Sequence, residues 1–373
     1  MAAARNVAIL GVGATPAGIM PGKTAEQLAL QAFKAALDDA GLNKEQIDGV
    51  LGATIAGSGI QQEQFCALVG INPKMTGALA YATSGFTLHY AISLIEAGIC
   101  ETVACVYARN PPGAGAALSG PHVYNAAHGL INANAIAALG WSQHMATYGS
   151  TEKALAAVVL AQRNYARMNP DAAFREPLTL EQYLAQEYLI WPLRELDIAL
   201  VGAAGMTVIV GSRDAARDCR KTPVYIEAMG RRQGVRLYEN DGYLLMDPMR
   251  DVARQVYGAA GLRPDDIEAL YIYDATSAVV LQTLENYGFC GVGECEAFVA
   301  DGRLEPASGF PLNTYGGHLS GGYLFGWLHH VEMVRQMRGE CGPRQIEKVP
   351  RVSQYCTTGG AREHYASTIF VTE

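Results

Sequence analysis

The chain has 373 residues, half of them apolar, and a formal net charge of −8. Such a chain can bury a large core, and its length suggests two similar domains. The acidic balance and the lack of a Lys/Arg cluster argue against a nucleic-acid partner. The sequence has no apolar run of about 18 residues, and residues 1–30 lack the pattern of a signal peptide. We therefore expect a cytoplasmic globular protein that does not contact a membrane.

Strand and helix patterns alternate along most of the chain, beginning with an apolar strand at residues 6–13. The GVGATP motif of this segment is similar to a dinucleotide-binding turn. It lacks the third glycine, however, and Pro16 follows where a helix should begin, so we predict no nucleotide site there. The alternation predicts an α/β fold with sheets covered by helices on both faces. Further buried strands are predicted at 101–108, 206–212, 222–230 and 366–373, and apolar helices at 84–98 and 321–339.

An internal repeat is the strongest organisational signal. The segments 32–54 and 252–276 both read as an amphipathic helix, an Ala-Gly-Leu stop, a short acidic turn and a strand. Gly41 corresponds to Gly261, an offset of 220 residues (261 − 41), and each glycine stands where a helix end favours a positive φ. The chain is therefore predicted to contain two copies of one α/β unit.

The predicted halves span residues 1–220 and 221–373, joined by the polar segment 212–223. Between about residues 111 and 192 the strand pattern gives way to helical segments rich in Ala, Gln, Tyr and Arg. We interpret this region as a helical insertion in the first half.

The cysteines have no regular spacing, which favours reduced thiols over a disulfide framework. Cys290 and Cys295, in GFCGVGEC, could form half of a zinc site. No second pair and no histidine at a matching spacing completes it, so we predict structural thiols and no metal site. The eight cysteines are at positions 66, 100, 105, 219, 290, 295, 341 and 356.

Several ordered motifs give the chain a family resemblance over nearly its whole length. They are YATSG (81–85), YDATSAVVLQTLENYGFCGVGE (273–294), NTYGGHLSGGY (313–323) and CTTGGA (356–361). With the duplicated unit and the insertion, these motifs resemble the thiolase superfamily, in its lipid-transfer-protein-like branch. The resemblance implies a thiolase-like fold, in which two duplicated βαβ-type halves form αβαβα layers and the first half carries a helical loop domain.

The sequence departs from thiolases at the residues that carry their chemistry. Ala82 stands where thiolases have the nucleophilic Cys, which excludes an acyl-cysteine at that position. Tyr323 stands where the oxyanion-hole His is found, and Tyr273 replaces the Asn or His of a second motif. This pattern is similar to the thiolase-fold retro-aldolases of bacterial steroid side-chain degradation. The resemblance implies cleavage of a β-hydroxyacyl-CoA, a steroid or bile-acid side-chain thioester, into a ketone or aldehyde and propionyl-CoA or acetyl-CoA.

Such a reaction needs an acid/base group but no covalent intermediate and no cofactor beyond the CoA thioester substrate. An unperturbed phenol has a pKa of about 10, so the site must lower that value or share a proton along a hydrogen-bonded pair. We predict Tyr273 and Tyr323 as that pair, and the sequence leaves open which one takes the hydroxyl proton. Asp274 and His318 are candidate orienting groups, and Cys356 lies near the position of the thiolase acid/base cysteine.

Other positions are predicted to bind substrate or to face solvent. We expect Gly316, Gly317, Gly322, Ala82 and Ser84 to line the substrate and CoA site, because a pantetheine arm needs room beside the backbone. In addition, the insertion offers cations for the CoA phosphates, namely Lys153, Arg163, Arg167 and Arg175, and His329 and His330 are expected on the exposed face of a helix.

The resemblance also implies partners. A homodimer is expected, with its contact near the segment TGALAYATSGF (76–86), and so is a small OB-fold protein that is often fused or bound to a hydratase. Two rival interpretations stay open at this point. One is an acyltransferase that uses Cys356 or another thiol, and the other is a non-catalytic subunit that holds a hydratase or thiolase in a complex.

Overall fold

The computed structural model of the chain describes residues 6–54, 60–80, 83–111, 115–116, 132–234, 247–359 and 364–373. Nine strands form one mixed sheet in the order β11-β12-β13-β10-β1-β9-β4-β2-β3. Their bounds are β1 Val7–Ala14, β2 Gly49–Thr54, β3 Met75–Ala80, β4 Thr102–Arg109, β9 Ala204–Ser212, β10 Val224–Gln233, β11 Ala269–Ile272, β12 Val352–Gly359 and β13 His364–Val371.

The helices cover this sheet and build the insertion. Within the described residues, no helix combines the length and the apolar character that crossing a membrane requires. The bounds are α1 Ala25–Ala40, α2 Gln62–Val69, α3 Ser84–Glu96, α4 Ala133–Tyr148, α5 Glu152–Met168, α6 Leu180–Leu184, α7 Arg213–Ala216, α8 Asp247–Ala260, α9 Ser277–Asn286, α10 Cys295–Val299 and α11 Trp327–Met337.

The strand order confirms the duplication predicted from the repeat. In the first half β2 pairs parallel with β4, β4 antiparallel with β9, and β9 antiparallel with β1. In the second half β11, β12, β13 and β10 repeat this pattern of parallel and antiparallel pairs. The halves meet where β1 pairs antiparallel with β10, so they form one continuous sheet. Gly41 (φ 75°) and Gly261 (φ 68°) both end their helices in the left-handed conformation, as the repeat predicts.

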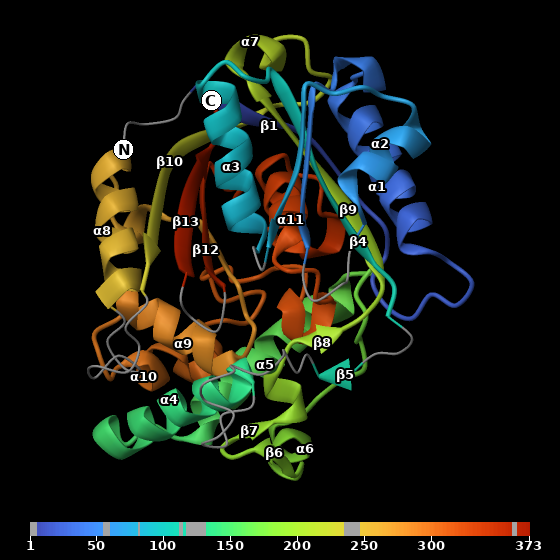
Figure 1. Cartoon of the computed structure of the whole chain (residues 1–373). Helices are drawn as coiled ribbons and strands as arrows, with labels where there is room; N and C mark the ends of the chain where they lie inside the picture. Colours follow the sequence, from blue (N-terminus) through green and yellow to red (C-terminus); the bar gives the residue numbers. More distant parts are fainter. Residues whose placement is uncertain are drawn as a thin grey trace.

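The two halves of the sheet enclose a central layer of helices (Figure 1). Helix α11 packs on β9 and β1 of the first half and on β11 and β12 of the second, and α3 likewise contacts strands of both halves. Helix α1 covers the outer face of the first half, and α8 covers that of the second. The arrangement is the five-layer αβαβα order that the resemblance implies, and it buries both faces of the central helices.

Close packing accounts for the glycines of the first strand. A Cβ at Gly11 would lie 2.5 Å from the carbonyl oxygen of Ala36, and one at Gly13 would lie 2.1 Å from that of Ala32. The GVG sequence therefore lets α1 lie directly against β1 and β9, and no nucleotide is needed to explain it.

The insertion lies between β4 and β9, at the bottom of Figure 1. Helices α4 to α6 fall inside the predicted range, and three short strands follow them: β6 Tyr188–Ile190, β7 Leu193–Arg194 and β8 Leu200–Val201. A further short strand, β5 Gly115–Ala116, pairs with β8. Helix α5 packs on α9 and on the turn at 317–321, so the insertion contacts the second half directly.

The connection between the halves is short. Strand β9 ends at Ser212 and β10 begins at Val224, with the helix α7 directly after β9. The segment predicted as a polar linker therefore contains a helical turn, and the predicted division at residue 220 falls between this turn and β10.

Candidate active site

Two tyrosines from separate segments of the second half meet at the centre of the molecule. Tyr273 follows β11 directly, and its N–H donates to the carbonyl oxygen of Cys356 at 2.8 Å. Tyr323 follows the glycine-rich turn and forms an isolated parallel bridge with Val201 of the insertion. Their phenolic oxygens lie 2.8 Å apart, and the side chains are nearly buried, with relative exposures of 6% and 9%. The pair predicted from the sequence is thus one hydrogen-bonded unit.

The imidazole of His318 supports both phenols. Its ring lies edge-on to Tyr273 and to Tyr323, with ring centroids 4.8 Å apart in each case. Its Nε2 accepts the backbone N–H of Gly326 at 3.0 Å, which leaves the ring proton on Nδ1. Burial, together with the neighbouring His329, holds the pKa of His318 well below its usual value. His318 is therefore a neutral ring that positions the two tyrosines.

Asp274 anchors the glycine-rich turn. Its Oδ2 accepts the backbone N–H groups of His318 (2.7 Å) and Leu319 (3.3 Å), at the start of a single π-helical turn at residues 317–321. Its Oδ1 lies 3.0 Å from Nε2 of His329 and 3.3 Å from Nδ1 of His318. Burial raises the pKa of Asp274, although the hydrogen bond from His329 acts in the opposite direction. The predicted orienting role of Asp274 thus has a geometric basis in these contacts.

The prediction that His329 and His330 face solvent is wrong. Both side chains are fully buried, because α11 is in the central layer and both of its faces are covered. His329 bridges Asp274 and the hydroxyl of Tyr315, which lies 3.3 Å from its Nδ1.

The protonation of the pair follows from its surroundings. Burial, reinforced by the neighbouring Tyr323, raises the pKa of Tyr273 well above its usual value. Burial also raises the pKa of Tyr323, while the hydrogen bond with Tyr273 and the charge of Arg109 partly oppose the shift. Both phenols are therefore neutral at pH 7 in the isolated chain. This geometry therefore does not lower the pKa of either phenol. It favours the other alternative, in which the two phenols share a proton.

Arg109 is a candidate residue that sequence analysis missed. It ends β4, its guanidinium carbon lies 5.6 Å from the centre of the Phe325 ring, and that ring packs against Tyr323. The Nε atom of Arg109 is buried and has no hydrogen-bond partner among the described residues. Arg109 is half-buried, and a guanidinium whose Nε has no partner among the described residues, close to Tyr323, is suited to stabilise a developing negative charge.

Cys356 is not part of the tyrosine pair, which corrects the prediction. Along β11 and β12 successive side chains alternate between faces, and Tyr273 and Tyr355 pack in one core cluster while Ile272 and Cys356 pack in the other. The Cys356 thiol instead lies 3.6 Å from the hydroxyl of Ser367, and burial raises its pKa to about 12. A neutral thiol on the opposite face cannot serve this site as a nucleophile.

The glycines predicted to border the CoA site face the protein's own atoms instead. A Cβ at Gly316 would lie 2.6 Å from the Cβ of Ala166, and one at Gly322 would lie 2.6 Å from that of Ala17. At Gly317 it would lie 2.3 Å from the Asp274 carboxylate. All three have positive φ angles of 104°, 139° and 58° in the order named, so backbone conformation and tight packing require glycine there.

The remaining predicted binding residues lie at the start of α3 or outside the description. Ala82 lies outside the described residues. Ser84 is fully buried, its N–H donates to the carbonyl oxygen of Phe325, and its hydroxyl donates to that of Tyr355 at 3.0 Å. Ser84 therefore joins the first half to the segment that carries Tyr323.

The cations predicted for the CoA phosphates have different surroundings. Arg163 is buried, and it donates to the hydroxyl of Ser320 at 2.9 Å and to the carbonyl oxygen of Glu176 at 3.1 Å, so it braces the glycine-rich turn. Lys153 borders a mostly apolar groove of about 340 Å³ between α5 and α10, whose other charged residues are all acidic, which does not suit a phosphate. Arg167 and Arg175 are exposed.

Asp274, His318 and His329 offer one donor atom each within 4.8 Å of one another, a spacing that could accept a metal ion. Here the protein already uses these atoms. Asp274 receives two backbone N–H groups and His329, and His318 Nε2 receives the N–H of Gly326. The contacts support the tyrosine pair and make a metal unnecessary at this position.

Comparison with known proteins identifies the family. Residues 235–372 match the family model described as thiolase C-terminal domain-like. A steroid side-chain-cleaving aldolase from Thermomonospora curvata is 31% identical over 89% of this chain and 90% of its own length. The 17-hydroxy-3-oxo-4-pregnene-20-carboxyl-CoA lyase of Mycobacterium tuberculosis is 30% identical over 95% of this chain and 96% of its own length.

Solved structures agree with the sequence comparison. The Ltp2-ChsH2(DUF35) aldolase matches with a TM-score of 0.88 and 29% identity, and the match covers 99% of this chain and 98% of that one. The chain therefore belongs to the thiolase superfamily, in the branch that contains these side-chain-cleaving aldolases. It is a carbon–carbon lyase of the thiolase fold, as the sequence motifs predicted.

Proposed function

We propose that the chain catalyses the retro-aldol cleavage of a β-hydroxyacyl-CoA derived from a steroid or bile-acid side chain. The products are a ketone or aldehyde and a short acyl-CoA, propionyl-CoA or acetyl-CoA. The observation that carries the proposal is the 2.8 Å contact between the hydroxyls of Tyr273 and Tyr323 at the site where thiolases place other catalytic groups. The two relatives named as a steroid side-chain aldolase and a steroid carboxyl-CoA lyase support the substrate class.

A relay through the two phenols accounts for the proton movement. The β-hydroxyl gives its proton to one tyrosine oxygen while that tyrosine gives its own proton to the other. The Cα–Cβ bond breaks, the β-carbon becomes the carbonyl carbon, and the electron pair forms the thioester enolate. In the same step the second tyrosine gives its own proton to the α-carbon as it receives the one from its neighbour, so neither phenol oxygen ever carries two protons. One proton moves from oxygen to carbon, and neither phenol needs to ionise outright.

The surroundings of the pair fit this relay. Because burial keeps both phenols neutral, each can donate and accept in the same step. Arg109 supplies the nearby positive charge that stabilises the enolate while it exists. His318 and Asp274 hold the rings and the turn in place, so little reorganisation is needed at the moment of reaction.

The same proposal includes two protein contacts. A small OB-fold partner, in some cases linked to a hydratase, is supported by the assembly named in the Ltp2-ChsH2(DUF35) structure. A homodimer is supported by β3, which is an edge strand of the sheet that the described residues form and has half-exposed side chains. A cytoplasmic location is supported by the eight cysteines, all within the described residues and all free thiols.

The test uses the chain co-expressed with its OB-fold partner and a β-hydroxy steroidal acyl-CoA, with products followed by mass spectrometry. Release of a ketone and a short acyl-CoA supports the proposal. If the substrate is recovered intact while CoA binding persists, the aldolase assignment fails in favour of a scaffolding role. Rapid acylation of a single cysteine by the acyl-CoA would favour an acyltransferase instead.

A further inference from the structure

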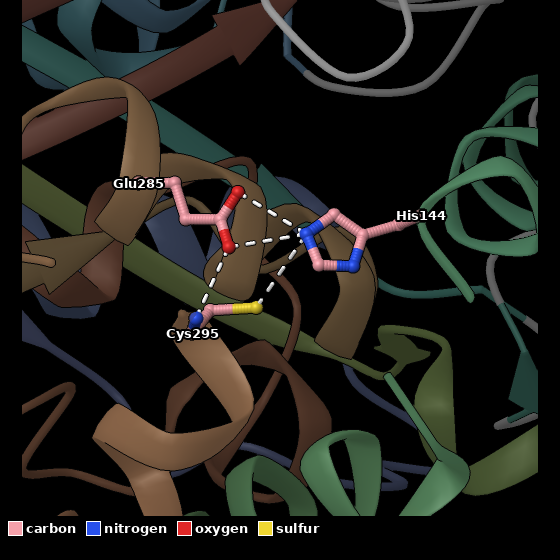
Figure 2. A group of neighbouring side chains, drawn as sticks. All are labelled: His144, Glu285 and Cys295. Carbon is pink, nitrogen blue, oxygen red and sulfur yellow. Dashed lines mark hydrogen bonds and ion pairs between the residues drawn. The ribbon is translucent and has the colours of Figure 1, made fainter. Parts of the chain in front are cut away.

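Three side chains from different helices converge on one buried point (Figure 2). His144 comes from α4 of the insertion, Glu285 from α9, and Cys295 from the start of α10. The side chains of His144 and Glu285 are 0% and 1% exposed, and Cys295 is 0% exposed. Their donor atoms all lie within 4.8 Å of one another. Sequence spacing could not reveal this group, because 151 residues separate His144 from Cys295.

The distances within the group suit a metal ion. Nε2 of His144 lies 3.1 and 3.2 Å from the two carboxylate oxygens of Glu285, and 3.9 Å from Sγ of Cys295. A tetrahedral zinc ion with ordinary bond lengths separates its nitrogen and oxygen ligands by about 3.3 Å and its nitrogen and sulfur ligands by about 3.6 Å. With Glu285 binding through both oxygens, three residues supply four donor atoms. The distances from Nε2 of His144 to the two oxygens and to the sulfur differ from these values by only a few tenths of an ångström.

The neighbouring chain holds each ligand in position. Oε1 of Glu285 accepts the backbone N–H groups of Gly293 (3.0 Å) and Cys295 (3.1 Å). The ring of His144 stacks on Trp141, with ring centroids 4.8 Å apart and ring planes inclined by 7°. The ring of Tyr148, one turn further along α4, also packs against it. Outer contacts of this kind orient metal ligands and fix their rotamers.

The charges also favour a divalent cation. Burial opposes the charged form of Glu285, but the hydrogen bonds from His144 and Cys295 outweigh it and hold the carboxyl pKa below its usual value. Burial and Glu285 together raise the pKa of the Cys295 thiol. One carboxylate, one thiolate and a neutral imidazole exactly balance a 2+ ion, so the loaded site carries no net charge in the core.

We propose that His144, Glu285 and Cys295 bind a structural Zn²⁺ ion that ties the helical insertion to the second half of the fold. Binding displaces the thiol proton of Cys295 to solvent. The imidazole takes the tautomer with its proton on Nδ1, a buried atom that has no hydrogen-bond partner among the described residues. The mixed nitrogen, oxygen and sulfur donor set is typical of zinc, and the closed setting is typical of a structural site. The inference is independent of the reaction catalysed at the tyrosines.

The test measures metal on the full-length chain, purified without chelator and then dialysed against zinc. About one zinc per chain is expected by mass spectrometry, and Co²⁺ loading should give the sulfur-to-cobalt charge-transfer band of a thiolate ligand. Cys295→Ser should abolish that band and weaken zinc binding by more than about 100-fold, the upper end of the loss expected for an outer-shell partner. Cys341→Ser is the matched control, because Cys341 is also a buried thiol beside a carboxylate, Glu332.

A second measurement uses the wild-type protein alone, so the proposal can be tested even if the ligand variants fold poorly. Removing zinc with a chelator should lower its melting temperature, and adding zinc back should restore it. The proposal is overturned if folded wild-type chain takes up less than about 0.1 zinc per chain in excess zinc. It is equally overturned if folded Cys295→Ser binds zinc as tightly as Cys341→Ser, since the group would then be a hydrogen-bonded cluster alone.

Discussion

The hydroxyls of Tyr273 and Tyr323 lie 2.8 Å apart, and each ring rests edge-on against the same imidazole of His318. Two phenols in hydrogen-bond contact at this distance can pass a proton from one oxygen to the other. The contact therefore gives the tyrosine pair a direct chemical meaning, and the first prediction concerns its loss.

Tyr273→Phe and Tyr323→Phe should each lower kcat/KM by roughly 10² to 10⁴, the usual contribution of acid/base catalysis. Because the phenols act as one relay, the double variant should lose little more than either single one. Product release is measured by mass spectrometry with the partner protein present. Tyr257→Phe is the control, since that hydroxyl bonds Gln354 elsewhere in the fold and its loss should leave turnover unchanged.

Arg109→Met should reduce kcat roughly 10-fold, because the charge that favours the ionised form of Tyr323 and the enolate is lost. The change should also move the basic limb of the pH–rate profile to higher pH, while Arg109→Lys should recover part of both effects. A profile that keeps its shape while KM alone rises would assign Arg109 to substrate binding and contradict the role proposed here.

Cys356→Ser should leave turnover within about 2-fold of wild type, since its thiol is buried on the opposite face of the sheet and acid/base groups that matter cost far more. Intact-protein mass spectrometry after mixing with the acyl-CoA should show no acyl adduct on this residue. A large loss of activity accompanied by loss of a covalent adduct would restore the acyltransferase interpretation.

The two adjacent histidines of α11 should respond differently to the same change. His329→Leu removes the contact between Tyr315 and the imidazole and one of the hydrogen bonds to the buried Asp274, and it should lower the free energy of unfolding by about 3 kcal/mol. His330→Leu should cost less than about 1 kcal/mol or stabilise the fold, because neither ring nitrogen of His330 has a hydrogen-bond partner among the described residues. Urea unfolding measures both, and equal losses would refute the assignment.

Because of Asp197, the free energy of unfolding should fall as the pH rises through the acid range. Burial raises its pKa from an ordinary 3.8 to about 6, against hydrogen bonds from Ser277, Arg194 and Tyr183. The folded state then keeps a proton that the unfolded state has lost, so the contribution is fully present below pH 3.8 and is lost by about pH 6. The stability difference between wild type and Asp197→Asn should shift against wild type by about 2 kcal/mol from pH 4 to pH 7. A difference that does not change with pH would contradict this.

The sequence by itself determined the duplicated architecture and singled out the two tyrosines whose hydroxyls meet in the fold. Helix stops at Gly41 and Gly261 repeat at a fixed offset because a left-handed residue is needed at each helix end. Both tyrosines could be picked out from their motifs, because the local backbone geometry of a motif places each of its residues at the same position in the fold. Ala82 likewise excluded an acyl-cysteine there without any structure.

Only the tertiary structure decided how the remaining groups are used. The phase of strand alternation points Cys356 away from the tyrosines, and it depends on pairing with β11 and β13. Sandwiching α11 between two sheet halves buries His329, although its sequence suggests a polar face. The glycine-rich turn needs its glycines for contacts with Ala166, Asp274 and Ala17. These outcomes depend on contacts with residues that are distant along the chain. Close packing of the core decides them, and local sequence patterns do not encode that packing.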